Sequence, residues 1–179
     1  MDAGDGLNDG AAPVGREPAS ESAVGPIPAA ATRPLRQTLL RPGAPAEQSV
    51  YPGDDDAPTV HFGAHVTGGG LVGVASLYRE ARPGADHPEA PAWRLRGMAV
   101  ASERQRAGVG AALLAACVAH VEGAGGTELW CNARVPAVGF YERAGFETVS
   151  PVFDIAGVGP HVVMRRPIGG GEAPRGASG

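Results

Sequence analysis

A glycine-bearing turn between an expected strand and an expected helix is the part of this chain best suited to bind a phosphate. It reads Gln105-Arg106-Ala107-Gly108-Val109-Gly110. The first backbone N–H groups of a helix lack intrahelical partners, and the helix dipole adds positive partial charge there. Glycine lets a phosphate approach the bare backbone, and Arg106 adds a cation suited to it. The turn is therefore a candidate cradle for a diphosphate.

Two common phosphate-binding loops do not match this turn. A Walker A loop requires Gly-Lys-Ser/Thr, and the chain contains no lysine. A dinucleotide fingerprint requires G-x-G-x-x-G directly after its strand, whereas Leu113 occupies the third glycine position here. G-x-G alone is equally compatible with a helix start in which small residues allow close packing. The motif therefore gains its weight from the sequence around it.

Two motifs, which follow one another along the chain, resemble motifs of the GNAT superfamily of N-acetyltransferases. Gln105, Gly108 and Gly110 form Q-x-x-G-x-G, which is similar to the acetyl-CoA pyrophosphate motif of that family. Residues 132–146 read N-x-x-x-x-A-x-x-F-Y-x-x-x-G-F, which is similar to a second family signature. The resemblance covers roughly residues 22–167. It implies transfer of an acetyl group from acetyl-CoA to a small-molecule amine or a protein amine; the alternative is a catalytically silent CoA-binding module of the same fold.

The resemblance also implies roles for individual residues. Tyr141 occupies the position of the general acid that protonates the leaving thiolate, although an aromatic residue there also suits helix packing. Asn132 occupies a cofactor-contacting position, although asparagine is also common in turns. The backbone of residues 98–100 is expected to hold the pantetheine arm and the oxyanion. The cofactor-binding residues expected on this basis are Met98, Ala99, Val100, Gln105, Arg106, Ala107, Gly108, Val109, Gly110, Ala111 and Asn132.

The general base is the point at which this sequence departs from the family pattern. Many family members carry a carboxylate on the strand before the cradle, and this chain has Arg94 and Arg96 there instead. Glu80, at the end of the preceding strand, is the candidate base. The alternatives are His61, His65, the aspartates at 54–56 and a chain of water molecules.

Arg94 and Arg96 share one face of their strand because side chains alternate along a strand. If that face lines the acceptor pocket, the substrate carries a carboxylate or phosphate beside its amine. If the face meets a helix instead, the two arginines are ion-pair partners within the structure. The sequence leaves both arrangements open.

The hydrophobic pattern predicts the elements that position these residues. Residues 93–100 are expected to form a strand, and residues 108–121 an amphipathic helix with apolar residues at helical spacing. A helix over residues 30–40 is expected to begin near Thr32, because proline suits only the first turn, and to bury its leucines at 35, 39 and 40. The other expected elements are strands at 23–27, 59–66, 71–78, 127–131, 146–155 and 161–165, and a helix at 136–144.

These elements predict an α/β fold of mixed α+β type. The order β-α-β-β-β-α-β-α-β-β gives a mixed, mostly antiparallel sheet of six to seven strands with helices on both faces. The strands before and after the central helix are expected to be parallel. The GNAT resemblance implies that they splay apart and hold acetyl-CoA between them. Asn132 is expected to end the second of these strands.

Composition favours one globular domain over residues 22–168, with disordered tails at 1–21 and 169–179. The chain has 179 residues, 43% hydrophobic content and a net charge of −4, which are ordinary values for a globular protein. We find neither a run of eighteen apolar residues nor the plan of a signal peptide, so a cytoplasmic protein without a membrane partner is expected. A mildly acidic chain without lysine predicts no nucleic-acid partner.

Cysteine and histidine spacing predicts neither a disulfide nor a metal site. Cys117 and Cys131 fall on the expected central helix and on a strand, where they suit a reduced core. His61 and His65 are four strand residues apart, about 13 Å, which is too far for one zinc ion. The oligomeric state is left open, with a homodimer among the alternatives.

Overall fold

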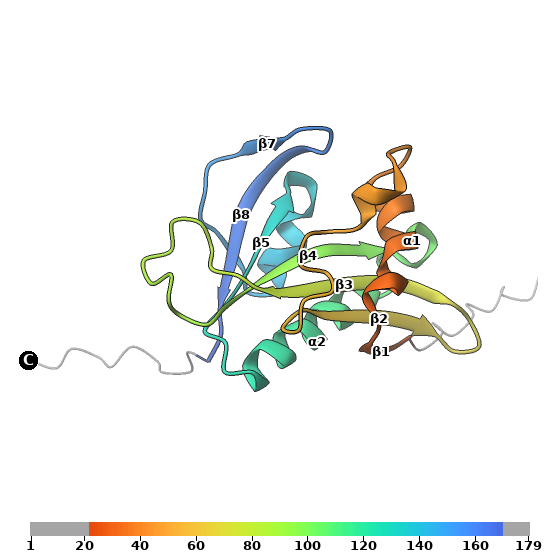
Figure 1. Ribbon diagram of the computed structural model, residues 1–179, viewed down its shortest axis with the longest axis horizontal. Coiled ribbons are helices and arrows are strands. Elements are labelled where there is room, and N and C mark those ends of the chain that lie inside the picture. Colours follow the sequence, from red (N-terminus) through yellow and green to blue (C-terminus); the bar gives the residue numbers. More distant parts are fainter. Residues whose placement is uncertain (1–21, 170–179) are drawn as a thin grey trace, which may run out of the picture.

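The structure is a computed structural model that describes residues 22–169. Of the tails expected at 1–21 and 169–179, all residues except Gly169 lie outside the described residues. Figure 1 shows a single twisted sheet with α1 (Ala29–Leu40) on one side and α2 (Val109–Gly123) on the other. Two parts of the sheet separate in this view, because β5 (Glu128–Arg134) and β8 (Gly159–Pro167) diverge from β4 (Ala92–Val100). The mixed sheet with helices on both faces is confirmed.

The sheet contains eight strands within residues 22–169, in the order β1-β2-β3-β4-β5-β8-β6, with β7 pairing with β8. The expected strand over residues 146–155 is wrong as a single element. It is divided into β6 (Glu147–Thr148) and β7 (Phe153–Ile155), and Pro151 between them has no N–H to continue a ladder. The remaining strands are β1 (Ser22–Pro26), β2 (Val60–Val66) and β3 (Leu71–Arg79).

The parallel pair expected around the central helix is present, and its two strands diverge. β4 and β5 pair in parallel only from Ala92↔Glu128 to Arg94↔Trp130, whereas β4 continues to Val100. From residue 95 onwards β4 therefore has a strand neighbour only on the β3 side. Asn132 does not end its strand, because β5 runs on to Arg134, where it still pairs with His161 of β8.

Helix α2 packs the core against one face of the sheet, as its apolar pattern predicts. Its buried side chains are Val109, Leu113, Leu114, Cys117, Val118 and Val121. Cys117 and Cys131 are both buried free thiols, and burial raises the pKa of each to about 12. Both thiols therefore remain protonated at neutral pH. Within the described range no helix is long and apolar enough to span a membrane.

Helix α1 differs from the expectation in its start and in its buried face. It begins at Ala29, so Pro34 lies in the second turn rather than the first. Its buried residues are Thr32 and Arg36, and the three leucines are only partly buried. The reason is that α1 covers the sheet face that carries Ser76 and Tyr78, and a polar face requires polar partners.

The remaining short elements connect these parts. A 3-10 helix over Ala46–Ser49 lies within the long loop at residues 41–58, and a second over Ser102–Arg104 precedes the cradle turn. After β5, a 3-10 turn over Val135–Ala137 leads into α3 (Val138–Arg143). The helix expected at 136–144 is thus present in a shorter form.

Candidate active site

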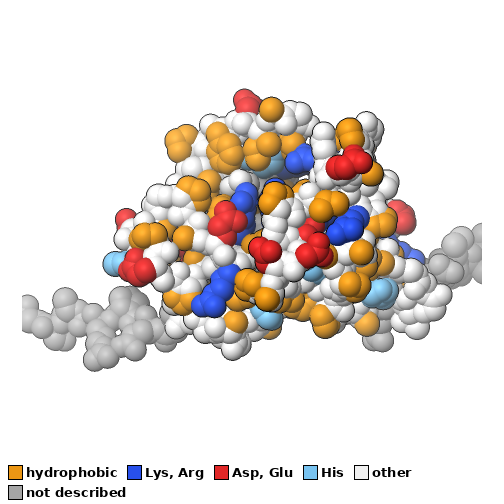
Figure 2. Space-filling model, in the orientation of Figure 1, with side chains coloured by type: hydrophobic (Ala, Val, Ile, Leu, Met, Phe, Trp, Pro, Cys, Tyr) orange, Lys and Arg blue, Asp and Glu red, His pale blue; other side chains and the backbone are white. Residues whose placement is uncertain are grey.

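A cavity of about 400 Å³ lies where β4 and β5 diverge. β4 contributes residues 94–98 to its wall and β5 contributes residues 131–134. Figure 2 shows this face of the molecule, with basic side chains, all arginines in this lysine-free chain, beside the hollow below the β7–β8 hairpin. Of the side chains expected in the site, Met98, Asn132 and Tyr141 line the cavity. The cradle turn and Glu80 lie outside its wall.

A bulge at Gly97 shapes the β4 side of the cavity. Val74 pairs with Ala99 and Ser76 with Arg96, so β4 contains one residue more than β3 between these pairs. Gly97 has φ of 64°, a left-handed value that favours glycine. A Cβ on it would lie 2.7 Å from Arg36 Nε and 2.9 Å from the Tyr51 ring. Only glycine fits, and the bulge redirects the strand beside the cavity.

The cradle turn contains two residues in the left-handed backbone conformation. Arg106 and Gly108 have positive φ values of 61° and 84°, and a left-handed non-glycine residue is a form of strain that occurs at ligand sites. Gly108 caps α2 without a side-chain hydrogen bond, so the first N–H groups of this 15-residue helix are not capped by a side chain. Residues 105–108 are exposed, and Gln105 Nε2 donates to the Val100 carbonyl at 3.2 Å.

Gly110 brings the cradle close to the cavity. A Cβ at this position would lie 3.6 Å from the Met98 methyl group and 3.5 Å from the Phe140 ring. Met98 in turn lines the cavity, and its sulfur accepts a long hydrogen bond of 3.8 Å from the Tyr141 hydroxyl. The cradle and the cavity are therefore neighbouring parts of one surface. Val109 is buried in the core, so it offers this surface only its backbone.

Tyr141 lies in α3 with its ring packed and its hydroxyl at the cavity. The ring makes edge contacts with Phe140 and Phe146, at centroid distances of 5.1 and 5.4 Å. Burial raises the pKa of Tyr141 well above its ordinary value, and the neighbouring Cys131 thiol adds to this effect. The hydroxyl therefore carries its proton throughout the physiological pH range.

Glu80 lies at the rim rather than in the wall of the cavity. Its carboxylate accepts hydrogen bonds from Arg94 Nη1 at 2.9 and 3.2 Å, and its side chain is 45% exposed. Its backbone carbonyl accepts a hydrogen bond from Trp130 Nε1 at 2.8 Å, which fixes this corner to β5. Among the alternative bases, His65 is exposed on β2, and His61 and Asp54 are buried outside the wall.

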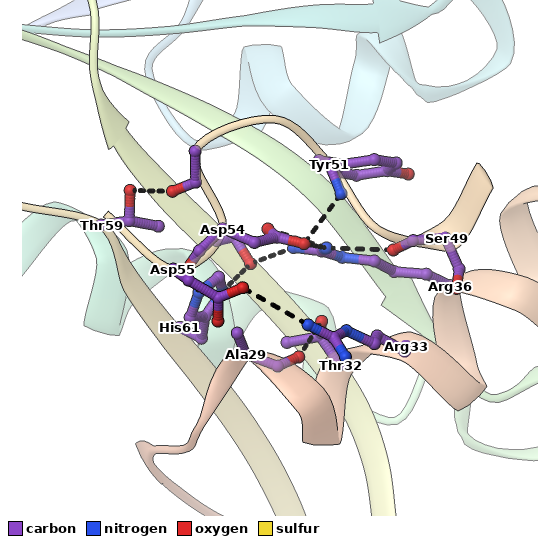
Figure 3. Close-up of polar contacts among 12 residues, drawn as sticks. Ala29, Thr32, Arg33, Arg36, Ser49, Tyr51, Asp54, Asp55, Thr59 and His61 are labelled. Atoms are coloured by element: carbon purple, nitrogen blue, oxygen red, sulfur yellow. Dashed lines mark hydrogen bonds and ion pairs between the residues drawn. The ribbon is translucent and has the colours of Figure 1, made fainter. Parts of the chain in front are cut away.

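Arg36, Asp54 and their partners form a buried polar network behind the cavity (Figure 3). The Arg36 side chain is 0% exposed, and its Nη1 lies 2.7 Å from Asp54 Oδ2. Tyr78 donates a short hydrogen bond to the same carboxylate. Burial alone would raise the pKa of Asp54, yet the hydrogen bonds from Arg36 and Tyr78 hold it below its ordinary value. Burial also raises the pKa of Tyr78 to about 12.

Ser76 and His61 complete this network. Ser76 Oγ accepts from Arg36 Nη2 at 2.7 Å and lies 2.6 Å from His61 Nδ1. His61 Nε2 lies 2.8 Å from the Asp54 backbone carbonyl, which only accepts, so Nε2 carries a hydrogen and donates to this carbonyl. The network joins α1, β2, β3 and the loop at 41–58, and it thereby fixes Tyr51 on the cavity wall.

Several residues of the site escaped the sequence reasoning. Arg36 belongs to a helix whose leucines were expected to form its buried face, and Tyr51 belongs to a loop that has no hydrophobic periodicity. His161 lines the cavity from β8, with Nδ1 2.7 Å from the Gly159 carbonyl, which leaves Nε2 for a ligand. Ser76, a polar residue within the largely apolar β3, is the sequence feature that could have indicated a polar face on α1. No sequence signal pointed to His161.

Arg94 and Arg96 share one face of β4, opposite Tyr78 and Ser76 of β3. Both side chains line the cavity, and Arg94 is also the ion-pair partner of Glu80. The Arg96 guanidinium lies 4.3 Å from the centroid of the Tyr51 ring. Within the described chain, no group of three or more His, Cys, Asp or Glu side chains is placed to hold a metal ion.

Comparison with known proteins assigns this chain to a family. The model of the acetyltransferase (GNAT) domain matches residues 47–166. The chain is 33% identical over 133 residues to an uncharacterized N-acetyltransferase, YitI, of Bacillus subtilis (strain 168), covering 74% of this chain and 87% of the relative. The protein belongs to the GNAT acetyltransferase family, as its two motifs indicate.

Solved structures share the fold at low sequence identity. The ribosomal-protein-S18-alanine N-acetyltransferase from Escherichia coli superposes with a TM-score of 0.63 at 18% identity, covering 83% of this chain and 94% of that one. An aminoglycoside 6'-N-acetyltransferase complexed with coenzyme A superposes with a TM-score of 0.62 at 15% identity, covering 87% and 99%. At these identities the likeness concerns the fold alone.

Proposed function

We propose that this protein transfers the acetyl group of acetyl-CoA to a primary amine of a small molecule or a protein. The observation that supports the proposal most strongly is the continuity of the cradle and the cavity through Gly110 and Met98. The N–H groups of Gly108 to Ala111, with Arg106, Ala107 and Gln105, would hold the diphosphate. The open edge of β4 at Met98, Ala99 and Val100 would hold the pantetheine arm, beside Asn132 on β5. Acetyl-CoA supplies the activated acyl group.

The proposed reaction is direct attack of the amine on the thioester carbonyl. The amine nitrogen forms a bond to the carbonyl carbon, and the developing oxyanion is stabilised by backbone N–H groups of β4 near the bulge. The C–S bond then breaks and the thiolate takes the Tyr141 proton. In water this transfer is uphill, because a phenol has a pKa near 10 and a thiol near 8.5. Burial raises the pKa of both kinds of group at this wall, the Cys131 thiol and the Tyr141 hydroxyl alike, so the transfer is completed when the proton that the amine releases returns through solvent to the Tyr141 oxygen.

A cradle variant tests the cofactor part of the proposal. Ala111 is exposed in the first turn of α2. The substitution Ala111→Glu should stabilise the helix through its dipole, while the added negative charge should repel the diphosphate. We expect wild-type protein to gain about 5–10 °C in its unfolding midpoint with CoA or acetyl-CoA at about a hundredfold the Kd, and none with NAD. The variant should bind CoA at least about tenfold more weakly, a loss of about 1.4 kcal/mol.

The matched control is Ala119→Glu, the same substitution at an exposed position about 12 Å further along α2. It should leave CoA binding unchanged. Equal weakening in both variants would indicate a general effect of charge on the helix and would contradict the cradle. CoA binding without thiol release on any amine would favour the silent binding module over the enzyme.

The base is tested by comparing Glu80→Gln with His161→Gln. We propose Glu80 as the group that accepts the amine proton at the rim, with His161 as the alternative on the wall. Loss of the base should lower kcat/KM by about 100-fold. The defect should shrink as the pH rises towards the pKa of the amine, because the amine then loses its proton unaided. An unaffected Glu80→Gln enzyme beside an impaired His161→Gln enzyme would transfer the role to His161.

A further inference from the structure

The cavity wall is strongly one-sided in its charge. Four arginines line it, namely Arg41, Arg94, Arg96 and Arg134, and the described wall contains no aspartate or glutamate. Arg94 is paired with Glu80, and Arg134 Nη2 donates to the Leu40 carbonyl at 3.3 Å. A wall of this composition favours a ligand that brings negative charge into the cavity.

Arg96, like Arg41, is a wall arginine without a counter-ion among the described residues, and it is the one that β4 carries beside the bulge. Within residues 22–169 it forms neither a salt bridge nor a hydrogen bond, and its contacts are with the Tyr51 ring at 4.3 Å and the Tyr78 ring at 6.0 Å. Its side chain is half-buried. Partial burial, and then the nearby charge of Arg94, lower the pKa of Arg96. A partly desolvated cation without a counter-ion is stabilised when an anion binds to it.

The position of Arg96 is fixed by the buried network. The Tyr51 ring on which it stacks also lies 4.3 Å from the Arg36 guanidinium, and the Tyr51 N–H donates to Asp54 Oδ2 at 2.9 Å. Arg96 pairs with Ser76 on β3, so it projects from the α1 face of the sheet. Its planar fork is therefore held in place before a ligand arrives, which suits bidentate binding of an oxyanion.

The phosphates of CoA are poorly placed to be this anion. Four strand residues separate Arg96 from Val100, or about 13 Å, and the cradle follows Val100. The pantetheine arm that would cross the cavity is uncharged. If the cofactor occupies the cradle, an anion beside Arg96 must belong to the acceptor.

Resting on the proposed function, we infer that the acceptor is an amine that carries an oxyanion, a carboxylate or a phosphate, and that Arg96 binds this group. The site then complements both ends of such a molecule. The Glu80 carboxylate lies at the rim beside Arg94, which is on the same face of β4 as Arg96, and it suits the amine end. The fork of Arg96 receives the anionic end, and the amine is directed towards the thioester.

The test uses acceptors in pairs that differ only in the anion. α-Amino acids, β-alanine and 4-aminobutyrate are compared with their amides, and O-phosphoethanolamine with ethanolamine, by thiol release from acetyl-CoA. We expect kcat/KM to favour the anionic member of at least one pair by tenfold or more. Preference within the carboxylate pairs or within the phosphate pair identifies which oxyanion is bound. Equal or better use of the neutral members by wild-type enzyme would overturn the inference.

Arg96 variants locate the effect. Arg96→Gln should remove the preference by raising KM for the anionic member, with the CoA Kd and the neutral member unaffected, and Arg96→Lys should retain part of it. Arg79→Gln is the matched control, because Arg79 is exposed on β3 and pairs with Trp93, which places it on the opposite face. A preference that survives in Arg96→Gln would overturn the assignment.

A binding measurement keeps the two proposals separate. The same pairs are followed by thermal shift on free and on CoA-saturated protein. Stabilisation by the anionic member alone, lost in Arg96→Gln, supports the inference even if turnover is absent. Equal stabilisation by both members, or by neither, contradicts it. Failure to bind CoA would instead contradict the proposed function, and the free protein would still report on the anion.

Discussion

Replacing Asp54 by asparagine should lower the free energy of unfolding by about 3–5 kcal/mol, because the substitution leaves a buried charge without its counter-ion. The Arg36 and Asp54 side chains are 0% and 1% exposed, so water cannot solvate the remaining guanidinium. A loss of this size is a large share of the 5–15 kcal/mol that typically stabilises a domain. It corresponds to about 6–20 °C in the midpoint of thermal unfolding for a domain of this length.

Asp55→Asn is the control for this prediction. Asp55 is the next residue, and it forms an ion pair with Arg33 at 3.6 Å, but its side chain is 78% exposed. Exposed pairs contribute about 0–1 kcal/mol, so the control should unfold close to wild type. Equal effects of the two substitutions in denaturant titrations would show that burial of the Arg36–Asp54 pair is not what stabilises this region.

The stability that Asp54 provides should depend on pH with a definite sign. Its pKa is lowered in the folded state, so the unfolded state binds a proton more readily. The contribution is therefore complete above the ordinary aspartate pKa, near 3.9, and is lost as the pH falls below it through the folded-state pKa. The difference in stability between wild type and Asp54→Asn should narrow in that acidic range. A difference that is constant from pH 6 down to pH 3 would contradict this linkage.

Replacing Tyr141 by phenylalanine should lower kcat by about 100-fold or more while leaving the affinity for CoA unchanged. The ring retains its contacts with Phe140 and Phe146, so the substitution removes only the hydroxyl. General acid catalysis of this kind contributes about 10²–10⁴-fold. Thiol release with a responsive amine, measured together with CoA binding, gives the two quantities.

An acyl donor with a more acidic thiol separates catalysis from packing. A better leaving group needs no proton, so an aryl thioester should restore much of the rate in Tyr141→Phe. Tyr78→Phe is the matched control, because its hydroxyl belongs to the buried network outside the cavity wall. Tyr78→Phe should lower the free energy of unfolding and leave kcat unchanged. A Tyr141 variant that is equally slow with both donors, or merely less stable, would show that the hydroxyl acts structurally.

Much of the fold was predictable because its strongest signals are local. The apolar stripe of α2 at Val109, Leu113, Cys117 and Val121 predicts which face is buried, since helical periodicity depends on the chain alone. α1 was misread because its burial depends on the partner. Arg36 is buried by Asp54, eighteen residues away, and by Ser76 and Tyr78 on β3.

The sequence by itself determined the family, the order of the elements up to α3 and the glycine turn at the start of α2, because motifs and periodicity are properties of neighbouring residues. Only the tertiary structure decided which residues line the cavity. It separates β4 from β5 after Arg94, places Arg96 and Tyr51 in contact, and brings His161 from the far end of the chain to the same wall. Whether a charged side chain finds a partner depends on contacts between segments that are distant in the sequence, and for that reason the charge of the cavity wall could not be predicted from any single motif.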